Sequence, residues 1–569
     1  MPEKNPRGYF TFVLHSHLPY VRRAGRWPHG EEMIHEALAE TYLPLLMALD
    51  QLVEEGLRPR LTLGLTPILL EQIADSDVLD SFEAYLGEEI AAARTDAERY
   101  RGTEPHLAYL AGFYEDFYRG VLESFCGKYN RDVVGGFRRL REAGCLDVLT
   151  CCATHSYLPL VSRDSTIYGQ LRTGYQSSQR HMRGARPTGI WLPECGYRPP
   201  YYTDDGVYKP GVEEFLAEVG LGYFFTETFV VAGSSAIGKV AGDVVGPYGV
   251  PRRRVVQTTE GVSKAGERSV LRPYYVRTPR VAVFARDPRT GMQVWSAAHG
   301  YPGDFDYREF HRKDTGSGLQ YWRVTGAQVD LGQKDYYHPD WAAGRVQVHA
   351  DHFAGLVAQS LRDFHDQYGR PGLIVSAYDT ELFGHWWFEG VAWLREVLRR
   401  LDANPEVGLT TAHDYLAAYP PDEVLDIPES SWGAGGDHST WMNEGTAWMW
   451  PLIHGAEERM ERIVAANPGA DGLQRELLAQ VARELVLLES SDWPFLVSTG
   501  QAAEYAVGRF QQHLARFNRL AQAAELRQMD DEVERFLRTC QRADNPFPDI
   551  DYRVFANREG KARAPSAAA

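Results

Sequence analysis

The sequence contains few cysteines, and they follow no recognisable pattern. Its 569 residues include six cysteines, and no two of them are spaced as CxxC. So few cysteines make no disulfide framework, and the missing CxxC pair disfavours a zinc ribbon or a thioredoxin-type site. We therefore expect reduced thiols and a cytoplasmic protein. The cysteines are Cys126, Cys145, Cys151, Cys152, Cys195 and Cys540.

Long apolar segments and nucleotide-binding motifs are also missing. The first apolar run, residues 9–14, has the length of a strand and not of a signal peptide. No stretch approaches the roughly 18 apolar residues of a membrane helix. No P-loop, no GxGxxG motif after an expected strand and no GxSxG motif occurs. We therefore expect no membrane span and no nucleotide cofactor.

The charge balance is acidic. The chain has 60 basic and 77 acidic residues, which gives a formal charge of −17 at pH 7. Such a protein repels phosphate groups, so we expect neither nucleic acid nor an anionic membrane as a partner. Aromatic residues make up 12% of the chain, with 13 Trp and 31 Tyr. This content suits a protein that stacks on the flat apolar faces of a neutral ligand.

Short apolar runs rich in β-branched and aromatic residues alternate with helix-like segments through residues 8–413. Near-continuous apolar strands separated by helices are typical of a parallel sheet that is covered on both faces. Seven or eight such strands favour a closed or nearly closed β/α barrel. The expected strands are residues 9–14, 60–65, 146–150, 189–192, 222–226, 280–285, 373–378 and 408–411.

Polar or ionisable residues follow each of these apolar runs. The active site of a β/α barrel lies at the carboxyl ends of its strands, so this pattern indicates a site there. The residues are His15, His17, Thr66, His155, Glu194, Glu227, Arg286, Asp287, Asp379 and His413.

The alternation of strands and helices is interrupted twice and ends near residue 420. Residues 75–135 look helical, so we expect a small helical insertion there. Residues 228–279 form a long segment without clear periodicity, and a loop of that length is usually functional or mobile. We expect a catalytic barrel over residues 1–420, a helical C-terminal domain over 421–556 and a disordered tail over 557–569. The expected C-terminal helices are residues 455–466, 473–490 and 500–540.

Two motifs carry candidate histidines and a candidate carboxylate. In HSHLPY, residues 15–20, alternation puts His15 and His17 on the same side of an extended segment. They either face one pocket or are loop histidines bonded to nearby backbone. In WLPECGY, residues 191–197, Glu194 ends an apolar strand in an aromatic setting that can hold a carboxylate poised as a base or nucleophile. The alternative for Glu194 is a helix cap or a salt-bridge partner.

A second carboxylate follows a later strand. SAYDTELFGHWW, residues 376–387, places Asp379 at the end of that strand, with Glu381 and His385 shortly after it. Together with Glu194 it supplies what glycoside chemistry needs. One group protonates the leaving oxygen while the other attacks C1 or activates water. The alternative for Asp379 is to cap the next helix.

Tryptophans are concentrated between residues 431 and 450. The glycines of SWGAGGDHSTWMNEGTAWMW prevent a long helix before Ser439, and Trp432 and Trp441 are predicted platforms for sugar rings. For Trp448 and Trp450 we favour an aromatic seam between domains. A further segment, SSDWPF at residues 490–495, adds Asp492 beside a Trp.

These five segments, in this order, resemble glycoside hydrolase family 57, and within it the 1,4-α-glucan branching enzymes. The resemblance extends from about residue 8 to about residue 525 and includes GLTPIL at 64–69. QVWSAAHGYPGD at 293–304 and SSDWPFLVSTGQAAEYA at 490–506 are similar to the branching-enzyme subgroup. The resemblance implies a distorted (β/α)7 barrel, of the α/β class, with a small helical insertion and an α-helical C-terminal domain.

The resemblance also implies roles for individual residues. Glu194 falls on the family's nucleophile and Asp379 on its general acid/base. No metal or organic cofactor is required, and the partner is an α-glucan such as amylose or glycogen. Residues that would line the sugar site are His15, His17, His155 and Asp492, and those that would flank the glucan groove are Trp295, Trp432, Trp441 and, in a mobile loop, Tyr248.

The implied activity is retaining transfer of a glucan chain from an α-1,4 linkage to a 6-hydroxyl group. Three alternatives stay open. A family 57 α-amylase or 4-α-glucanotransferase would use the same carboxylates with another acceptor. A metal-dependent polysaccharide hydrolase or deacetylase would use His15, His17 and an Asp as ligands. A non-catalytic glucan-binding protein would keep the tryptophans without needing both Glu194 and Asp379. The sequence predicts no particular oligomeric state.

Overall fold

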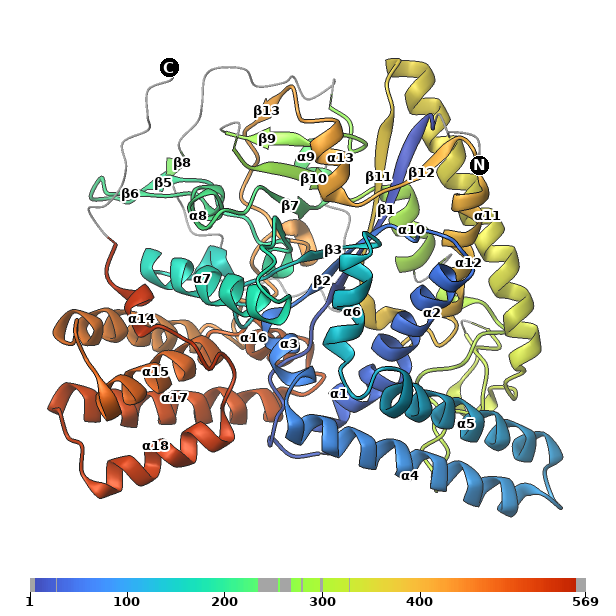
Figure 1. The fold of residues 1–569 in the computed structure, drawn as a ribbon, viewed down its shortest axis with the longest axis horizontal. Coiled ribbons are helices and arrows are strands. Elements are labelled where there is room, and N and C mark those ends of the chain that lie inside the picture. The colour runs from blue at the N-terminus through green and yellow to red at the C-terminus, as the bar shows by residue number, and fades with distance from the viewer. Residues whose placement is uncertain are drawn as a thin grey trace.

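The centre of the molecule is a barrel of parallel strands (Figure 1). The computed structural model describes residues 6–26, 28–233, 254–255, 268–277, 280–296, 300–326 and 328–558. The strands are almost entirely buried, as expected for apolar runs that face a filled barrel interior on one side and helices on the other. In order around the barrel they are β1 (Gly8–Ser16), β2 (Leu61–Leu65), β3 (Leu146–Leu149), β4 (Gly189–Ile190), β7 (Tyr223–Thr226), β10 (Ala282–Ala285) and β11 (Gly372–Asp379).

Backbone hydrogen bonds connect these seven strands around the barrel. β1 pairs in parallel with β11 on one side and with β2 on the other, and β2 pairs with β3. A parallel bridge between Thr150 and Ile190 joins β3 to β4, and β7 links β4 to β10. The N–H of Asp287, just after β10, donates to the carbonyl of Val375 in β11 at 2.9 Å. The barrel is therefore closed at the carboxyl ends of its strands, as the predicted (β/α)7 fold requires.

The eighth expected strand is not part of the barrel wall. β12 (Val407–Leu409) pairs with residues 8–10 in the first half of β1, whereas β2 pairs with residues 13–16 in its second half. Since β11 runs along the other edge of β1, β12 and β2 share one edge. The apolar run at 408–411 correctly indicated a strand, but periodicity carries no information about which neighbour a strand finds.

The barrel is distorted between β10 and β11. β9 (Tyr274–Val276) pairs antiparallel with the start of β10, and β13 (Val424–Leu425) pairs with β9. The N–H of Leu373, at the start of β11, donates to the carbonyl of Leu271 at 2.8 Å. These segments fill the gap between the amino-terminal halves of β10 and β11. Their backbone groups thus find partners there although the two barrel strands diverge.

Helices cover the outside of the barrel. α4 (Ser76–Tyr100) and α5 (Pro105–Glu123) form a long hairpin along its lower side (Figure 1), within the expected helical insertion. The carboxylate of Asp75 accepts from two N–H groups of the first turn of α4 and so caps it. The other helices of this part are α1 (Glu31–Ala37), α2 (Leu43–Glu54), α3 (Pro67–Ile73), α6 (Val133–Glu142), α7 (Asp164–His181), α8 (Val212–Val219), α9 (Thr228–Ala232), α10 (Pro288–Trp295), α11 (Pro339–Tyr368), α12 (Gly390–Ala403) and α13 (Ala412–Ala418).

In the described part of the chain, five α-helices follow the barrel and lie beside it (orange to red in Figure 1). α15 is buried on nearly every side from Leu477 to its end, so the others pack around it. The expected single helix at 500–540 is two helices, because Arg527 adopts a left-handed φ of +51° and Asp530 caps a new helix. The five are α14 (Met449–Ala466), α15 (Gly472–Leu488), α16 (Asp492–Thr499), α17 (Ala503–Leu526) and α18 (Asp531–Ala543).

The expected loop at 228–279 and the expected tail are described only in part. Within the loop the structure gives α9, β9 and β8 (Arg254–Val255), the last paired with β5 (Tyr201–Tyr202), which also pairs with β6 (Tyr208–Lys209). At the start of the tail, the side-chain amide of Asn557 donates to Glu461 at 3.0 Å. Among the described residues, no helix combines the length and the apolar character needed to cross a membrane.

Candidate active site

The carboxyl ends of β1 and β11 place the first candidate residues side by side. His15 and Asp379 are partners in the parallel register of these strands, so both lie on the same rim of the barrel. The ring of His17 lies 6.0 Å from that of His15, with 21° between their planes. The two histidines thus lie on one side of the chain, as the alternation of an extended segment predicts.

Glu194 occupies a strained turn directly after β4. Its φ is +59°, and the next residue, Cys195, has φ +51°. Two consecutive non-glycine residues in the left-handed region cost free energy, and such strain persists where the surroundings hold the chain in place. The carbonyl of Glu194 accepts from the backbone N–H of Trp432 at 2.9 Å. The turn carries the carboxylate into the barrel mouth and does not cap a regular helix.

Two donors hold the carboxylate of Glu194. The indole Nε1–H of Trp432 donates to Oε2 at 2.6 Å, and the hydroxyl of Ser491 lies 3.3 Å from Oε1. Burial raises the pKa of Glu194 to about 7, although both of these hydrogen bonds act in the opposite direction. The nearby charge of Asp492 raises this pKa further, while that of His17 lowers it. About half of the Glu194 carboxyl is therefore ionised near pH 7, and the ionised form, which can act as a nucleophile, predominates at higher pH.

Asp379 differs from Glu194 because its carboxyl group keeps its proton. Burial, together with the charges of Glu381 and Glu194, raises its pKa well above the ordinary value, and Arg286 compensates only in part. Part of its surface still opens to the barrel mouth. A carboxyl group that keeps its proton beside a carboxylate that has lost its own is the arrangement by which proteins divide acid and nucleophile roles between two like residues.

A buried third carboxylate stands behind this pair. Glu381 accepts from the backbone N–H of His17 at 3.0 Å and from the phenol of Tyr42. Burial raises the pKa of Glu381 to about 7 against the effect of these two donors. Tyr42 ends a short π-helical segment, residues 38–42, and such segments often occur at functional sites. The sequence showed Glu381 two residues after Asp379, but no signal pointed to Tyr42.

Three histidines form a compact group at the mouth. Nε2 of His15 lies 3.0 Å from Nε2 of His155, and the rings of His17 and His155 stack 3.9 Å apart. Burial and the neighbouring charge of His17 lower the pKa of both His15 and His155 well below the ordinary value. Burial alone would lower the pKa of His17 as well, but the charge and hydrogen bond of Asp492 raise it.

The C-terminal helices contribute directly to this group. Nε2 of His17 lies 3.0 Å from the carboxylate of Asp492, the first residue of α16, and its Nδ1 lies 3.2 Å from the hydroxyl of Thr66. Ser491, one residue earlier, contacts both Glu194 and His155. Asp492 was a sequence candidate, whereas Ser491 was missed although it stands beside Asp492 in SSDWPF.

The histidines are not arranged as metal ligands. Both ring nitrogens of His17 are engaged by Asp492 and Thr66. In the part of the chain that the structure describes, the one cluster with suitable ligand spacing is Glu484, His513 and Asp544, inside the C-terminal helices. Arg516 binds Asp544 there, so the cluster already contains a cation. Neither group supports the alternative of a metal-dependent deacetylase.

The predicted tryptophan platforms differ in their accessibility. Trp432 is partly open, and its ring lies 5.2 Å from that of Trp191. Trp295, at the end of α10, is 38% exposed. Trp441 is fully buried and stacks 4.2 Å from Tyr157. Trp441 thus presents no open ring face in this structure, and its role as a sugar platform stays a prediction.

Trp448 and Trp450, the predicted aromatic seam between domains, differ in their burial. Trp450 is buried and donates from Nε1 to the carbonyl of Trp441 at 3.0 Å. Trp448 is 40% exposed, with one edge on Phe510.

Tyr248, the predicted residue of the mobile loop, lies outside the described residues.

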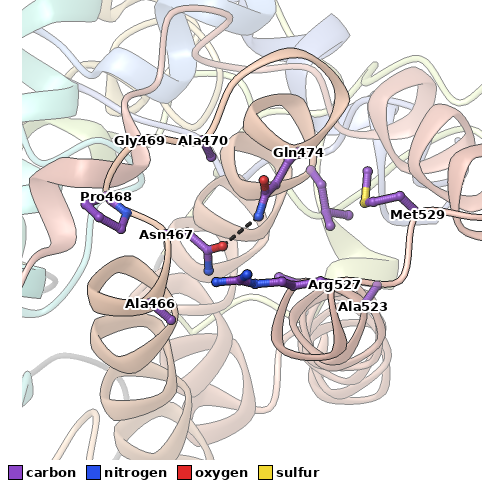
Figure 2. Close-up of a pocket in the computed structure, with 11 residues that line it drawn as sticks. Ala466, Asn467, Pro468, Gly469, Ala470, Gln474, Ala523, Arg527 and Met529 are labelled. Carbon is purple, nitrogen blue, oxygen red and sulfur yellow. Dashed lines mark hydrogen bonds between the residues drawn. The ribbon is translucent and has the colours of Figure 1, made fainter.

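A separate surface pocket lies in the C-terminal helices, between the end of α14 and the start of α15 (Figure 2). Asn467 and Gln474 are hydrogen-bonded across it at 2.6 Å, and Arg527 extends toward them. None of its lining residues belongs to the group around Glu194 and Asp379. The candidate active site is therefore the group around Glu194 and Asp379, whose pKa values are strongly shifted, and not this pocket.

Comparison with known proteins agrees with this arrangement. Residues 11–428 match the family described as glycosyl hydrolase family 57, and residues 452–555 match the C-terminal region of 1,4-α-glucan branching enzymes. A 1,4-α-glucan branching enzyme from Thermococcus kodakarensis is 43% identical over 547 residues, which cover 95% of this chain and 77% of that protein.

Solved structures show the same relationship. The crystal structure of the Thermococcus kodakarensis family 57 branching enzyme, in complex with glucose and additives, superposes with a TM-score of 0.87 at 42% identity, over 97% of each chain. The α-amylase AmyC from Thermotoga maritima superposes with a TM-score of 0.80 at 31% identity, over 97% of this chain and 99% of that one. The predicted fold and the predicted branching-enzyme subgroup are thus confirmed. The chain belongs to glycosyl hydrolase family 57.

Proposed function

We propose that the protein is a retaining 1,4-α-glucan branching enzyme. It would cleave an α-1,4 linkage and transfer the released glucan to a 6-hydroxyl group, forming an α-1,6 branch in a glycogen-like glucan. The observation that carries the proposal is the pair of carboxyl groups at the barrel mouth. Two hydrogen bonds favour the ionised form of Glu194, whereas the pKa of Asp379 lies well above its ordinary value, which favours its protonated form. The similarity to branching enzymes over nearly the whole chain supports the choice of acceptor.

In the first step, the carboxylate of Glu194 attacks C1 of the glucose unit whose linkage is cleaved. The bond between C1 and the bridging O4 breaks, and Asp379 gives its proton to O4 as the non-reducing chain stays on the enzyme. A β-linked glycosyl ester on Glu194 results, and the reducing-end part of the donor chain leaves with its new 4-hydroxyl. The strained turn at Glu194 fixes the direction from which the carboxylate approaches C1.

In the second step, Asp379 acts as a base. It takes the proton of a 6-hydroxyl on the acceptor chain, and the oxygen attacks C1 and displaces Glu194. Two inversions give net retention of the α configuration, and Asp379 is protonated again for the next cycle. Retaining enzymes hold the two carboxyl groups roughly 5–5.5 Å apart. The proposed mechanism therefore requires that spacing between Glu194 and Asp379 in a glucan complex.

The remaining site residues would bind and orient the glucan. The His17–Asp492 pair can donate and accept hydrogen bonds with sugar hydroxyls, because both side chains are partly open to the mouth. Trp432 and Trp295 present aromatic surface for the apolar faces of glucose rings. Transfer also requires that water be kept from the glycosyl ester while the acceptor is held in place. We retain Tyr248 as the proposed residue of the loop that does this.

The decisive experiment is incubation of the enzyme with amylose, followed by counting of α-1,6 linkages by proton NMR alongside reducing ends. A branching enzyme forms one α-1,6 linkage for nearly every α-1,4 linkage cleaved, with few new reducing ends. The similarity to AmyC favours α-amylase as a second candidate, for which reducing ends would greatly outnumber α-1,6 linkages. Redistributed chain lengths without any α-1,6 linkage would indicate a 4-α-glucanotransferase.

The proposal includes the organisation and location of the enzyme. Residues 1–420 would be the catalytic unit and residues 421–556 the helical domain, although the latter supplies Ser491 and Asp492 to the site. All six cysteines are free thiols, mostly buried, which suits the reducing cytoplasm proposed here.

A further inference from the structure

Ser491 lies where the C-terminal helices meet the barrel. It connects α15 to α16, and it is 1% exposed. Its Oγ lies 2.9 Å from Nδ1 of His155 and 3.3 Å from Oε1 of Glu194. Its backbone N–H donates to the carbonyl of His155 at 3.1 Å, which holds the residue in place independently of its side chain. The hydroxyl is therefore located between an imidazole of the barrel and the proposed nucleophile.

The number of protons available determines the direction of these hydrogen bonds. An ionised carboxylate can only accept, so the single proton of the Ser491 hydroxyl must point to Glu194. Nδ1 of His155 must then donate to Oγ. His155 is buried and neutral, so its other nitrogen carries no proton and accepts from Nε2–H of His15 at 3.0 Å. The remaining nitrogen of His15, Nδ1, then carries no proton.

The surroundings of His15 agree with this assignment. Its Nδ1 is buried and finds no hydrogen-bond partner among the described residues. An unpaired buried acceptor is tolerated better than an unpaired buried N–H. If the chain ran in reverse, from a protonated Glu194 through Ser491 and His155, His15 would carry its proton on this unpartnered Nδ1. The geometry thus favours the direction that ends on an ionised Glu194.

We propose that Ser491 is a positioning residue for the nucleophile, as the last link of a one-way hydrogen-bond chain from His15 through His155 and Ser491 to Glu194. The inference rests on the proposed role of Glu194. Ser491 holds Oε1 while Trp432 holds Oε2, so the plane of the carboxylate is fixed from two sides. The C-terminal helices therefore help to orient the carboxylate of the nucleophile and do not only shape the groove.

The chain opposes the effect of burial on Glu194. Burial favours the protonated carboxyl, whereas every link of the chain favours the carboxylate. Other titratable groups act on Glu194, or are acted on by it, and none of them is removed by changing Ser491. They are His17, His155, Tyr157, Asp379, Asp492 and the thiols of Cys151 and Cys195. Loss of the Ser491 hydroxyl should therefore raise the pKa of Glu194.

The test compares the pH dependence of kcat/KM for wild type, Ser491→Ala and Ser491→Thr on an aryl maltooligosaccharide. Ser491→Ala should move the acid limb of the profile upward by about one pH unit. Below that limb kcat/KM should fall roughly tenfold, with little change in KM. Ser491→Thr retains the hydroxyl and should retain the wild-type limb. Thr499→Ala, at the last residue of α16, removes a hydroxyl that donates to the Phe495 carbonyl and serves as the matched control. An unmoved limb in folded Ser491→Ala would overturn the proposal.

A second measurement needs no change at Ser491. Nitrogen NMR of ¹⁵N-histidine-labelled wild type, at a pH above the limb, should show His155 as the Nδ1–H tautomer, with His155→Asn used to assign its signals. An Nε2–H tautomer would overturn the chain even if Ser491→Ala failed to fold.

Failure of the proposed function is detected separately. A 5-fluoroglucosyl fluoride should label the nucleophile, and peptide mass spectrometry locates the label. A label on another residue would refute the role of Glu194. A label on Glu194 with an unmoved limb would refute only the role of Ser491.

Discussion

The indole N–H of Trp432 gives the sharpest prediction about the nucleophile. It donates to Oε2 of Glu194 at 2.6 Å, and Trp432→Phe removes this donor while keeping an aromatic ring beside Trp191. The backbone N–H of residue 432, which donates to the carbonyl of Glu194, is retained by any side chain. The substitution therefore changes one hydrogen bond at the carboxylate and leaves the turn that carries it.

The expected size of the effect follows from this geometry. A hydrogen bond to a charged group contributes about 1.5–3 kcal/mol, and about 1.36 kcal/mol corresponds to one pH unit. Its loss should raise the pKa of Glu194 from about 7 to about 8 or 9. At pH 7, about half of the wild-type carboxyl is ionised, against about 1–10% in the variant. We expect kcat/KM at pH 7 to fall about 5- to 50-fold and to recover as the pH rises above the new limb.

The assay is the pH profile of kcat/KM on an aryl maltooligosaccharide, measured for wild type and Trp432→Phe. Trp450→Phe is the matched control, because its indole N–H donates to the carbonyl of Trp441 and not to the carboxylate. The control should leave the acid limb where it is. A loss in Trp432→Phe that is equal at every pH, or an acid limb at the wild-type pH, would refute the assignment of Trp432 as a donor that keeps Glu194 ionised.

Four further substitutions test the site and its support. Glu194→Gln should lower activity by several orders of magnitude with folding intact, because the covalent route is lost; near-wild-type turnover of the purified variant would contradict this. Asp379→Ala should lower amylose cleavage by about 10²–10⁴-fold, and an activated aryl glycoside should suffer less in its first step; equal losses on both would indicate a structural role. Trp441→Ala should cost about 3–5 kcal/mol of unfolding free energy in denaturant titration, since the ring is fully buried, and a raised KM without destabilisation would instead support the platform role. Gly384→Ala should cost about 2–4 kcal/mol, because φ is +107° and the added Cβ would lie 1.8 Å from a backbone oxygen; Gly56→Ala, at φ +86° in open space, isolates the backbone strain alone.

Much of the fold was predictable because its signals are local. Each barrel strand is a short apolar run, and each run ends in polar residues where a parallel strand reaches the barrel mouth. His15 and Asp379 lie on one rim for this reason, since both stand at carboxyl ends of parallel strands. The alternation at residues 15–17 likewise indicated that both histidines face one way. Strand periodicity and strand polarity are properties of neighbouring residues, so the sequence displays them directly.

Burial and partner choice were not predictable in the same way. Trp432 and Trp441 look alike in the sequence, yet one contacts Glu194 and the other packs under Tyr157. The run at 408–411 has the pattern of a barrel strand, but the first half of β1 is the edge that it finds. A tryptophan or an apolar run carries the same local signal in either place. Its environment depends on which distant segments cover it.

The sequence by itself thus determined most of the strands and helices along the chain and the rim on which Glu194 and Asp379 lie. The tertiary structure alone decided which groups shift the pKa values of these carboxyl groups. Ser491 stands 297 residues from Glu194 and Tyr42 stands 339 residues from Glu381, so no local pattern connects them. A hydrogen bond and a desolvated charge depend on distances of a few ångströms between side chains. Those distances exist only once the C-terminal helices have packed against the barrel mouth.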